Sequence, residues 1–327
     1  MSGAAARPGG GTDGAMEPAP FHHDVADAAE SARALWVSAP DGARVRIGLL
    51  GEGGRGTVLL FPGRTEFVEK YGPAGRAFAA RGYATLAVDW RGQGMTDRPL
   101  PDRATGHVDR FVAYQSDVAA ALQAAEALAL PRPWHLIGHS MGGAIGLRAV
   151  YSGLPVASAV FSGPMWGIAL SPLLRPTAWV VTTLSRPVGL GGRIVPGSDS
   201  TCYVLEAPFE DNVLTTDPDM FAWMKAQLRA YPDLALGGPS MTWVNEALRE
   251  TRALARRRAP DLPCLCVTGE NERIVDVPAI RRRMEGWPKG RMVMEPGAEH
   301  EVMMERAEVR ERFFDAACAL FDANRGN

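Results

Sequence analysis

Residues 134–151 read WHLIGHSMGGAIGLRAVY, and this stretch decides the fold. The apolar run over residues 134–138 predicts a buried strand, and Met141 opens a pattern typical of a helix. Between them lies GHSMG, residues 138–142, a G-x-S-x-G sequence in the strand-to-helix context of a nucleophile elbow. The glycines allow a tight turn that lifts the Ser140 hydroxyl to the carboxyl edge of the sheet. The main-chain N–H of Met141, at the helix start, can then bind developing negative charge. Ser140 is therefore the candidate nucleophile, the alternative being a structural serine in a glycine-rich turn.

Strands and helices alternate along most of the remaining chain. Apolar or alternating runs predict strands over residues 32–38, 45–50, 57–61, 84–88, 134–138, 156–161, 263–267 and 291–294. Helical patterns cover residues 69–81, 111–130, 141–151, 217–231, 242–258, 278–284 and 303–323. The first two strands flank Asp41-Gly42, a hairpin turn signal. Together these patterns predict an α/β fold, with a mainly parallel sheet wrapped by helices on both faces.

The alternation is interrupted once and then resumes. A sheet that is interrupted and later completed predicts one core domain, residues 21–163 and 261–327, with an inserted helical cap over residues 164–260. The inserted segment holds four of the eight tryptophans of the chain. These rings can form a small core of their own, line an apolar substrate pocket, or do both.

The beginning of the chain is rich in glycine and alanine and has no apolar centre. Residues 1–20 are therefore predicted to be a disordered tail. Ordered-looking sequence begins near Met16, so either Met1 or Met16 is the expected start of the protein.

An activated serine needs a neighbouring imidazole, which in this arrangement follows the serine along the chain. Five of the six histidines precede Ser140, and only His300 follows it. His300 lies in a loop between the last predicted strand and the closing helix, where the base belongs. His139 is adjacent to Ser140 in sequence, but its side chain should leave the turn in another direction, and we interpret it as structural.

The third member of a triad is a carboxylate that orients the imidazole and stabilises its charged form. It should lie just past the strand at residues 263–267, where Glu270, Glu272 and Asp276 are the candidates. Glu272 fits best and Glu270 second, against the alternative that these are solvated loop carboxylates.

Three places in the chain resemble the serine hydrolases that include bacterial lysophospholipases and monoacylglycerol lipases. They are FPGRTE at residues 61–66, DWRGQGMTD at residues 89–97, and the triad loops with the GHSMGG elbow. The resemblance implies the α/β-hydrolase fold with an inserted helical cap. It also implies hydrolysis of carboxylic esters of acyl lipids through an acyl-enzyme on Ser140. The histidines are few and scattered, and no phosphate loop or dinucleotide fingerprint stands out, so no metal and no cofactor are expected.

The same resemblance implies an oxyanion hole built from the main-chain N–H groups of Arg64 and Met141. It also aligns Glu272, not Glu270, with the family acid. Two positions depart from the family pattern: Pro62 stands where a histidine is common, and Glu272 stands where an aspartate is usual. Support of the oxyanion loop and the geometry of the acid are therefore expected to differ.

Composition excludes several other classes. A net charge of −2 and a sequence pI near 6.3 give no basic excess for nucleic-acid binding. No apolar stretch reaches the length of a transmembrane helix. The four cysteines have no zinc-ligand spacing and indicate a reducing, cytoplasmic compartment, with association at a membrane surface left open.

Two alternative functions remain: a peptidase or acyltransferase that uses the same triad, and a non-catalytic ligand-binding protein. Oligomeric state is left undetermined.

Overall fold

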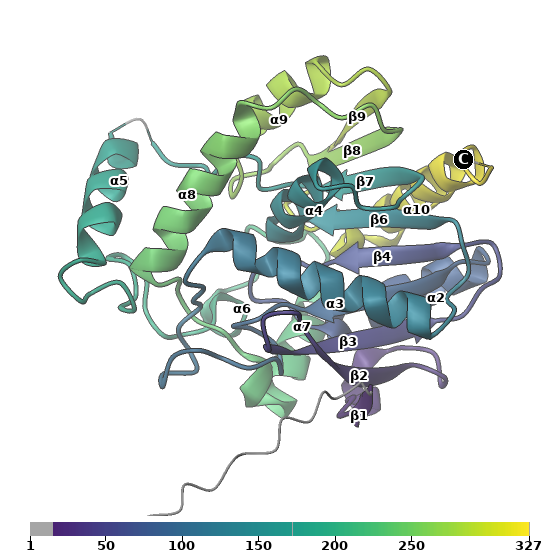
Figure 1. Ribbon diagram of the computed structural model, residues 1–327, viewed down its shortest axis with the longest axis horizontal. Coiled ribbons are helices and arrows are strands. Elements are labelled where there is room, and N and C mark those ends of the chain that lie inside the picture. The colour runs from purple at the N-terminus through teal and green to yellow at the C-terminus, as the bar shows by residue number, and fades with distance from the viewer. Residues whose placement is uncertain (1–15, 172, 327) are drawn as a thin grey trace, which may run out of the picture.

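The computed structural model describes residues 16–171 and 173–326. Within these residues the strands form one nine-stranded sheet in the order β1-β2-β3-β5-β4-β6-β7-β8-β9 (Figure 1). They are β1 (Glu17–Ala19), β2 (Arg33–Ser38), β3 (Arg44–Gly51), β4 (Thr57–Phe61), β5 (Ala84–Asp89), β6 (Trp134–His139), β7 (Ser158–Ser162), β8 (Cys264–Gly269) and β9 (Gly290–Glu295). Neighbours from β5 to β9 are parallel, whereas β1, β2, β3 and β5 pair antiparallel. The predicted α/β class with a mainly parallel sheet is confirmed.

Helices cover both faces of this sheet. The described helices and 3-10 turns are α1 (His23–Ala26), η1 (Val68–Tyr71), α2 (Gly72–Ala80), η2 (Phe111–Ala113), α3 (Tyr114–Ala127), α4 (Met141–Tyr151), α5 (Leu174–Ser185), α6 (Tyr203–Glu206), α7 (Pro218–Ala230), η3 (Pro232–Leu234), α8 (Met241–Ala255), α9 (Val277–Glu285), η4 (Val302–Met304) and α10 (Ala307–Asp322). In Figure 1, α3 and α4 lie in front of the sheet and α10 behind it.

The two faces of the sheet pack into separate hydrophobic cores. In β4, Leu59 and Phe61 join the core that contains α3 and α4, while Val58 and Leu60 join the core that contains α2 and α10. Successive side chains of a strand point to opposite faces, so a strand covered on both faces must be apolar at every position. This is why residues 57–61 read as a continuous apolar run.

The segment between β7 and β8 contains α5 to α8. Asp217 begins α7 as predicted, because its carboxylate accepts the N–H groups of Asp219 and Met220 at 2.9 and 3.1 Å. Ser240 caps α8 in the same way, with its hydroxyl 3.0 Å from the Trp243 nitrogen. Helix α5 lies at the outer side of α8, away from the sheet (Figure 1).

Two predictions at the ends of the chain need correction. Residues 17–19, assigned to the tail, form β1, which pairs antiparallel with β2; residues 1–15 lie outside the described part. The closing helix was predicted from residue 303 but begins at Ala307. Glu305 has an extended backbone, and its buried carboxylate accepts the Glu299 N–H at 2.7 Å and the Thr216 hydroxyl at 2.5 Å. These tertiary bonds hold the chain before α10 out of the helix.

Candidate active site

Ser140 lies at the junction of β6 and α4 with a left-handed backbone, φ 50° and ψ −117°. Side chains flanking this turn would collide with main chain: a Cβ on Gly142 would meet the Phe61 carbonyl, and one on Gly138 would meet that of Gly142. The Ser140 N–H donates to the Ser162 carbonyl at 3.0 Å, and its own carbonyl accepts the Met165 N–H at 2.8 Å. The strained backbone is therefore fixed by neighbours, as the elbow interpretation requires.

His300 and Glu272 form a buried pair at the same edge of the sheet. His300 Nδ1 lies 2.5 Å from Glu272 Oε2, and the two side chains are 4% and 0% exposed. The other oxygen, Oε1, accepts the N–H groups of Ile274 and Val275 at 2.6 and 3.1 Å. The fold thus brings the predicted base and the favoured carboxylate together.

The attraction between the imidazole and the carboxylate shifts the pKa values of this pair in opposite directions. Burial opposes the charged forms of both groups, yet the imidazole and the backbone N–H groups lower the pKa of Glu272 below its ordinary value. For His300, burial would lower the pKa, but the facing Glu272 carboxylate raises it above the ordinary value. An ionised Glu272 places the proton on His300 Nδ1 and leaves Nε2 with a free lone pair.

The other two candidate carboxylates have different roles. Glu270 is exposed and accepts the Gly297 N–H at 3.0 Å, while Asp276 caps α9 through the Ala279 N–H at 3.0 Å. Neither contacts His300 among the contacts of the described residues.

Ser140 and His300 line one cavity of about 400 Å³. Its wall is mostly apolar, with side chains from the core and from the segment between β7 and β8: Phe67, Met165, Ile168, Val204, Val213, Leu214, Met224, Leu228, Trp243, Ile274 and Val275. Of the tryptophans in that segment, Trp243 lines the cavity, whereas Trp166 packs in the core between Phe161 and Trp287.

The predicted oxyanion donors lie beside Ser140. Arg64 and Met141 both line the cavity, and within the described residues neither main-chain N–H has a hydrogen-bond acceptor. The loop that carries Arg64 passes close to the elbow: a Cβ on Gly63 would lie 3.1 Å from the Cβ of Ser140. Arg64 and Met141 therefore each have a main-chain N–H without an acceptor close to Ser140 in the fold, and an oxyanion hole needs such donors.

Side chains from residues 89–97 support this loop. Trp90 Nε1 donates to the Pro62 carbonyl at 2.9 Å, and Gln93 Nε2 donates to the Gly63 and Glu66 carbonyls at 2.8 and 3.0 Å. Pro62 stands where a histidine is common in the family, and the bonds from Trp90 and Gln93 hold the oxyanion loop in this chain. Reasoning from sequence quoted this segment for its resemblance but did not assign Gln93 a role.

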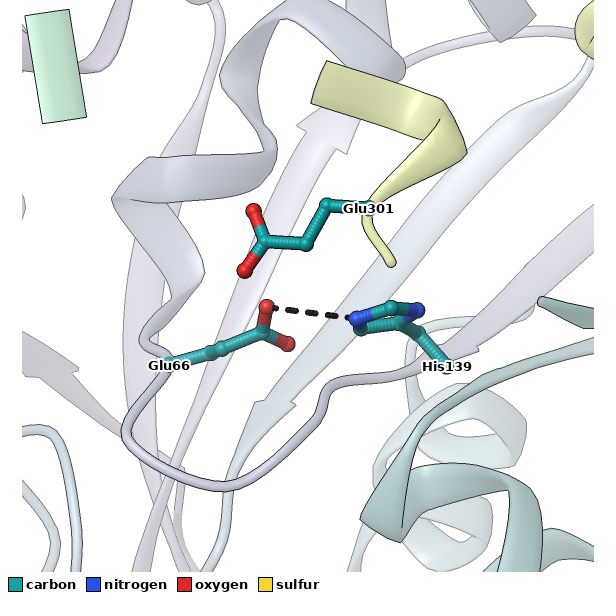
Figure 2. Close-up of side chains that lie close together, drawn as sticks. All are labelled: Glu66, His139 and Glu301. Carbon is teal, nitrogen blue, oxygen red and sulfur yellow. Dashed lines mark ion pairs between the residues drawn. The ribbon is translucent and has the colours of Figure 1, made fainter. Parts of the chain in front are cut away.

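A buried charged network behind the site was also missed. Lys70 Nζ lies 2.8 Å from Glu66 Oε1 and 2.7 Å from both oxygens of Glu301, and Tyr71 donates its hydroxyl to Glu66 at 2.5 Å. Figure 2 shows the Glu66 carboxylate pointing at His139, whose Nε2 is 3.7 Å from Glu66 Oε1, and the Glu301 carboxylate next to that of Glu66. Two features of the sequence could have indicated this network: Glu66 and Lys70 are spaced i,i+4, and Glu301 follows His300.

The carboxylates of this network are already held by a cation of the protein. Glu66, His139 and Glu301 place possible ligand atoms within 4.8 Å of one another. The Lys70 ammonium bonds to both carboxylates, however, and holds the pKa of Glu66 down at about 2 against the effect of burial. Burial lowers the pKa of His139 to about 4, so this ring is neutral at physiological pH. We interpret the cluster as an ion-pair network that positions loops.

His139, which we interpreted as structural, lies close to the proposed base and at the cavity. Its Nδ1 lies 3.0 Å from the Ser162 carbonyl, which fixes the ring, and the ring centroid is 4.8 Å from that of His300. It also lines the cavity. Its ring leaves the elbow toward Glu66, as Figure 2 shows.

Comparisons with known proteins agree with this geometry. A family model described as "Serine aminopeptidase, S33" matches residues 53–307. The probable lysophospholipase L2 of Haemophilus influenzae is 31% identical over 258 residues, which cover 78% of this chain and 80% of the relative. Lysophospholipase L2 of Escherichia coli K12 is 32% identical over 286 residues, covering 83% and 81%.

Solved structures share the α/β-hydrolase fold. A monoglyceride lipase from Saccharomyces cerevisiae superposes with a TM-score of 0.69 at 21% identity, covering 87% of this chain and 93% of the lipase. A carboxyl esterase from Bacillus coagulans superposes with a TM-score of 0.71 at 15% identity, covering 90% and 99%. At these identities the likeness establishes the fold.

Proposed function

The chain belongs to the serine aminopeptidase S33 family and is a lysophospholipase-like carboxylic ester hydrolase, and we propose that it acts through an acyl-enzyme on Ser140. The carrying observation is the His300–Glu272 pair, whose imidazole borders the same apolar cavity as the strained Ser140. In this proposal His300 is the base, Glu272 the acid partner, and the main-chain N–H groups of Arg64 and Met141 form the oxyanion hole.

The chemistry follows from the protonation state of the pair. Ser140 Oγ attacks the ester carbonyl carbon while His300 Nε2 takes its proton. The Glu272 carboxylate stabilises the imidazolium that forms, and the two N–H groups bind the negative oxygen of the tetrahedral intermediate. The imidazolium then gives its proton to the leaving alcohol. Water, activated by the same imidazole, releases the fatty acid and restores Ser140.

The wall of the cavity favours a lipid acyl chain. Residues 164–260, proposed as a cap, contribute much of this wall, including Val204, Met224, Leu228 and Trp243. An acyl chain gains free energy by leaving water for such a surface. The curated relatives carry the name lysophospholipase. We infer that the substrate is a single-chain acyl lipid, a lysophospholipid or a monoacylglycerol.

One observation favours the ester over a peptide. An aminopeptidase must bind the ammonium group of its substrate, and free carboxylates are the usual partners for such a group. The two carboxylates that line the cavity, Glu66 and Glu301, are both bonded to Lys70. The cavity therefore offers a peptide N-terminus no free acidic partner among its described lining residues.

An apolar surface beside the cavity fits work at a lipid bilayer. The described part of the chain has nine exposed large hydrophobic side chains, and eight of them lie in one stretch: Leu173, Leu174, Val180, Val181, Leu184, Val188, Leu190 and Tyr203. Tyr203, at the end of this stretch, and Ile168, which precedes it in sequence, also line the cavity. Residues 164–198 contain three arginines and no acidic residue, which suits an anionic membrane surface.

We therefore infer that this face, called here the α5 face, rests on a bilayer and receives lipid from it. No helix in the described residues is both long and apolar enough to pass through a membrane. The four cysteines are free and buried, which supports a reducing compartment, and we place the protein at the cytoplasmic side.

The activity is tested with purified protein on three esters: a lysophospholipid, a monoacylglycerol of the same acyl chain, and a p-nitrophenyl ester. We expect hydrolysis of at least one acyl lipid and labelling of Ser140 by a fluorophosphonate. Ser140→Ala should lose both while keeping the same unfolding transition. Wild-type protein that neither reacts with the probe nor cleaves any of these esters would overturn the proposal.

A further inference from the structure

Arg64 lines the cavity, and its guanidinium is a cation without an acidic partner among the described residues. Within the described residues no carboxylate lies within ion-pair distance of it, and its buried Nε has no acceptor. Its Nη2 donates to the Gly237 carbonyl at 2.5 Å, and its Cζ lies 5.3 Å from the ring centre of Trp243, which also lines the cavity. Burial without a compensating carboxylate lowers the pKa of Arg64 to about 10, so the group stays charged at physiological pH.

Other arginines of the described residues that are largely removed from solvent have more partners. Arg46 bonds to Glu69 and Asp89, and Arg91 bonds to Asp41 and Asp117. Arg283 bonds to the Tyr151 hydroxyl and the Leu254 carbonyl and does not line the cavity. Arg98 has no carboxylate partner, but it donates to four main-chain carbonyls and does not line the cavity. Arg64 has one such carbonyl bond. It therefore keeps unused donors beside the site, where an anion could take them.

Covalent geometry limits how far this cation lies from the reacting ester. The main-chain N–H of Arg64 is one of the two proposed oxyanion donors. The guanidinium can therefore lie no farther from the bound oxyanion than the length of the arginine side chain allows. In a 1-acyl lysophospholipid, the phosphorus is separated from the ester carbonyl carbon by the same number of bonds that separates the Arg64 amide nitrogen from its guanidinium carbon. One residue can thus reach both groups of one substrate.

We propose that the Arg64 side chain binds the phosphate of a lysophospholipid while its main-chain N–H binds the oxyanion. This inference rests on the proposed function and adds the substrate class that the site selects. A guanidinium forms strong bidentate bonds with phosphate, and the ring of Trp243 keeps its plane oriented. A monoacylglycerol has a neutral glycerol at this position and gains no such bond. Arg64 therefore favours the phosphorylated lipid over the neutral one.

The test changes the side chain and keeps the main-chain donor, because every substitution except proline retains the N–H. Arg64→Met and Arg64→Lys are compared with wild type on a lysophosphatidylcholine and a monoacylglycerol of the same short acyl chain, as monomers. We expect Arg64→Met to lower kcat/KM for the lysophospholipid about 10- to 100-fold, the size of a lost charge-assisted bond. The loss of kcat/KM for the monoacylglycerol should be at least about tenfold smaller than the loss for the lysophospholipid, and Arg64→Lys should recover part of the lysophospholipid loss.

Arg252→Met is the matched control. This exposed arginine also lies over a tryptophan, 6.0 Å from the ring centre of Trp179, but it does not line the cavity. Its variant should leave both substrates unchanged. Equal losses on both lipids for Arg64→Met would indicate a structural role in holding Gly237 and would overturn the inference, as would an unchanged lysophospholipid rate. If the proposed function itself fails, wild type cleaves neither lipid and Ser140 is not labelled, which distinguishes the two failures.

Discussion

The Lys70 ammonium lies 2.7 Å from both carboxylate oxygens of Glu301, the residue that follows His300. The same ammonium bonds to Glu66, which accepts the Gly63 N–H in the loop that carries Arg64. One buried cation therefore joins the loop of the proposed base to the loop of a proposed oxyanion donor. These loops are far apart in sequence, so Lys70 contributes to holding the two halves of the site together.

Removing this cation should destabilise the protein strongly. Lys70→Met leaves two buried carboxylates without their ammonium, and breaking a buried ion pair typically costs about 3–5 kcal/mol. Urea unfolding of wild type and variant measures the difference. The control is Lys289→Met, because Lys289 and its partner Asp261 are 55% and 71% exposed and such surface pairs contribute less than about 1 kcal/mol. Similar midpoints for both variants would contradict the role given to Lys70.

The two glutamates of the acid loop should differ in their effect on catalysis. Glu272→Gln removes the charge that orients His300, and the loss of the acid in comparable triads lowers kcat about 10⁴-fold. Glu270→Gln removes a carboxylate that bonds only to the Gly297 N–H among its described contacts, so its kcat should stay within about threefold of wild type. Turnover of a p-nitrophenyl ester measures both. A larger loss for Glu270→Gln would reverse the assignment of the acid.

The pH dependence follows from the raised pKa of His300. The base must be neutral, and Glu272 raises the pKa of its imidazolium, so kcat/KM should fall as pH decreases through a value above the ordinary 6.5 of histidine. In Glu272→Gln the raising carboxylate is gone and burial, which lowers the pKa, remains. The acid limb of the residual activity should therefore move to lower pH. An acid limb at the same pH in both proteins would show that another group controls it.

The sequence predicted those features that show as a local pattern or as an order of residues along the chain. The elbow was found from the glycine spacing around Ser140, and part of its requirement is local, since a Cβ on Gly138 would meet the Gly142 carbonyl within the turn. The strand at 57–61 was found from its unbroken apolar pattern. His300 was found by its order in the chain.

Features that join distant segments were missed. Glu305 interrupts the closing helix because it bonds to Thr216, and Gln93 supports a loop thirty positions earlier, at Gly63. Glu270 and Glu272 are two residues apart in one loop, and only the folded backbone decides which side chain meets His300. The sequence favoured Glu272, but the contact with His300 is formed only in the fold.

The α5 face gives a prediction about membrane binding that is separate from the chemistry. A variant with Leu174→Asp, Val180→Asp and Leu184→Asp places three negative charges on side chains that are 59%, 57% and 59% exposed. Because binding scales with buried apolar area and with attraction to anionic lipid, its affinity for phosphatidylglycerol vesicles in flotation should fall at least about tenfold. Hydrolysis of a water-soluble ester should be unchanged, since none of the three side chains lines the cavity.

The control for this face is Val112→Asp. Val112 is 45% exposed and is the one large exposed hydrophobic of the described residues outside the stretch from 173 to 203. Its variant adds a single charge away from α5 and should bind vesicles as wild type does. If Val112→Asp weakens flotation as much as the α5 variant does, the loss reflects overall negative charge and the α5 face has no special role. If the α5 variant keeps full binding, the membrane contact lies on another surface.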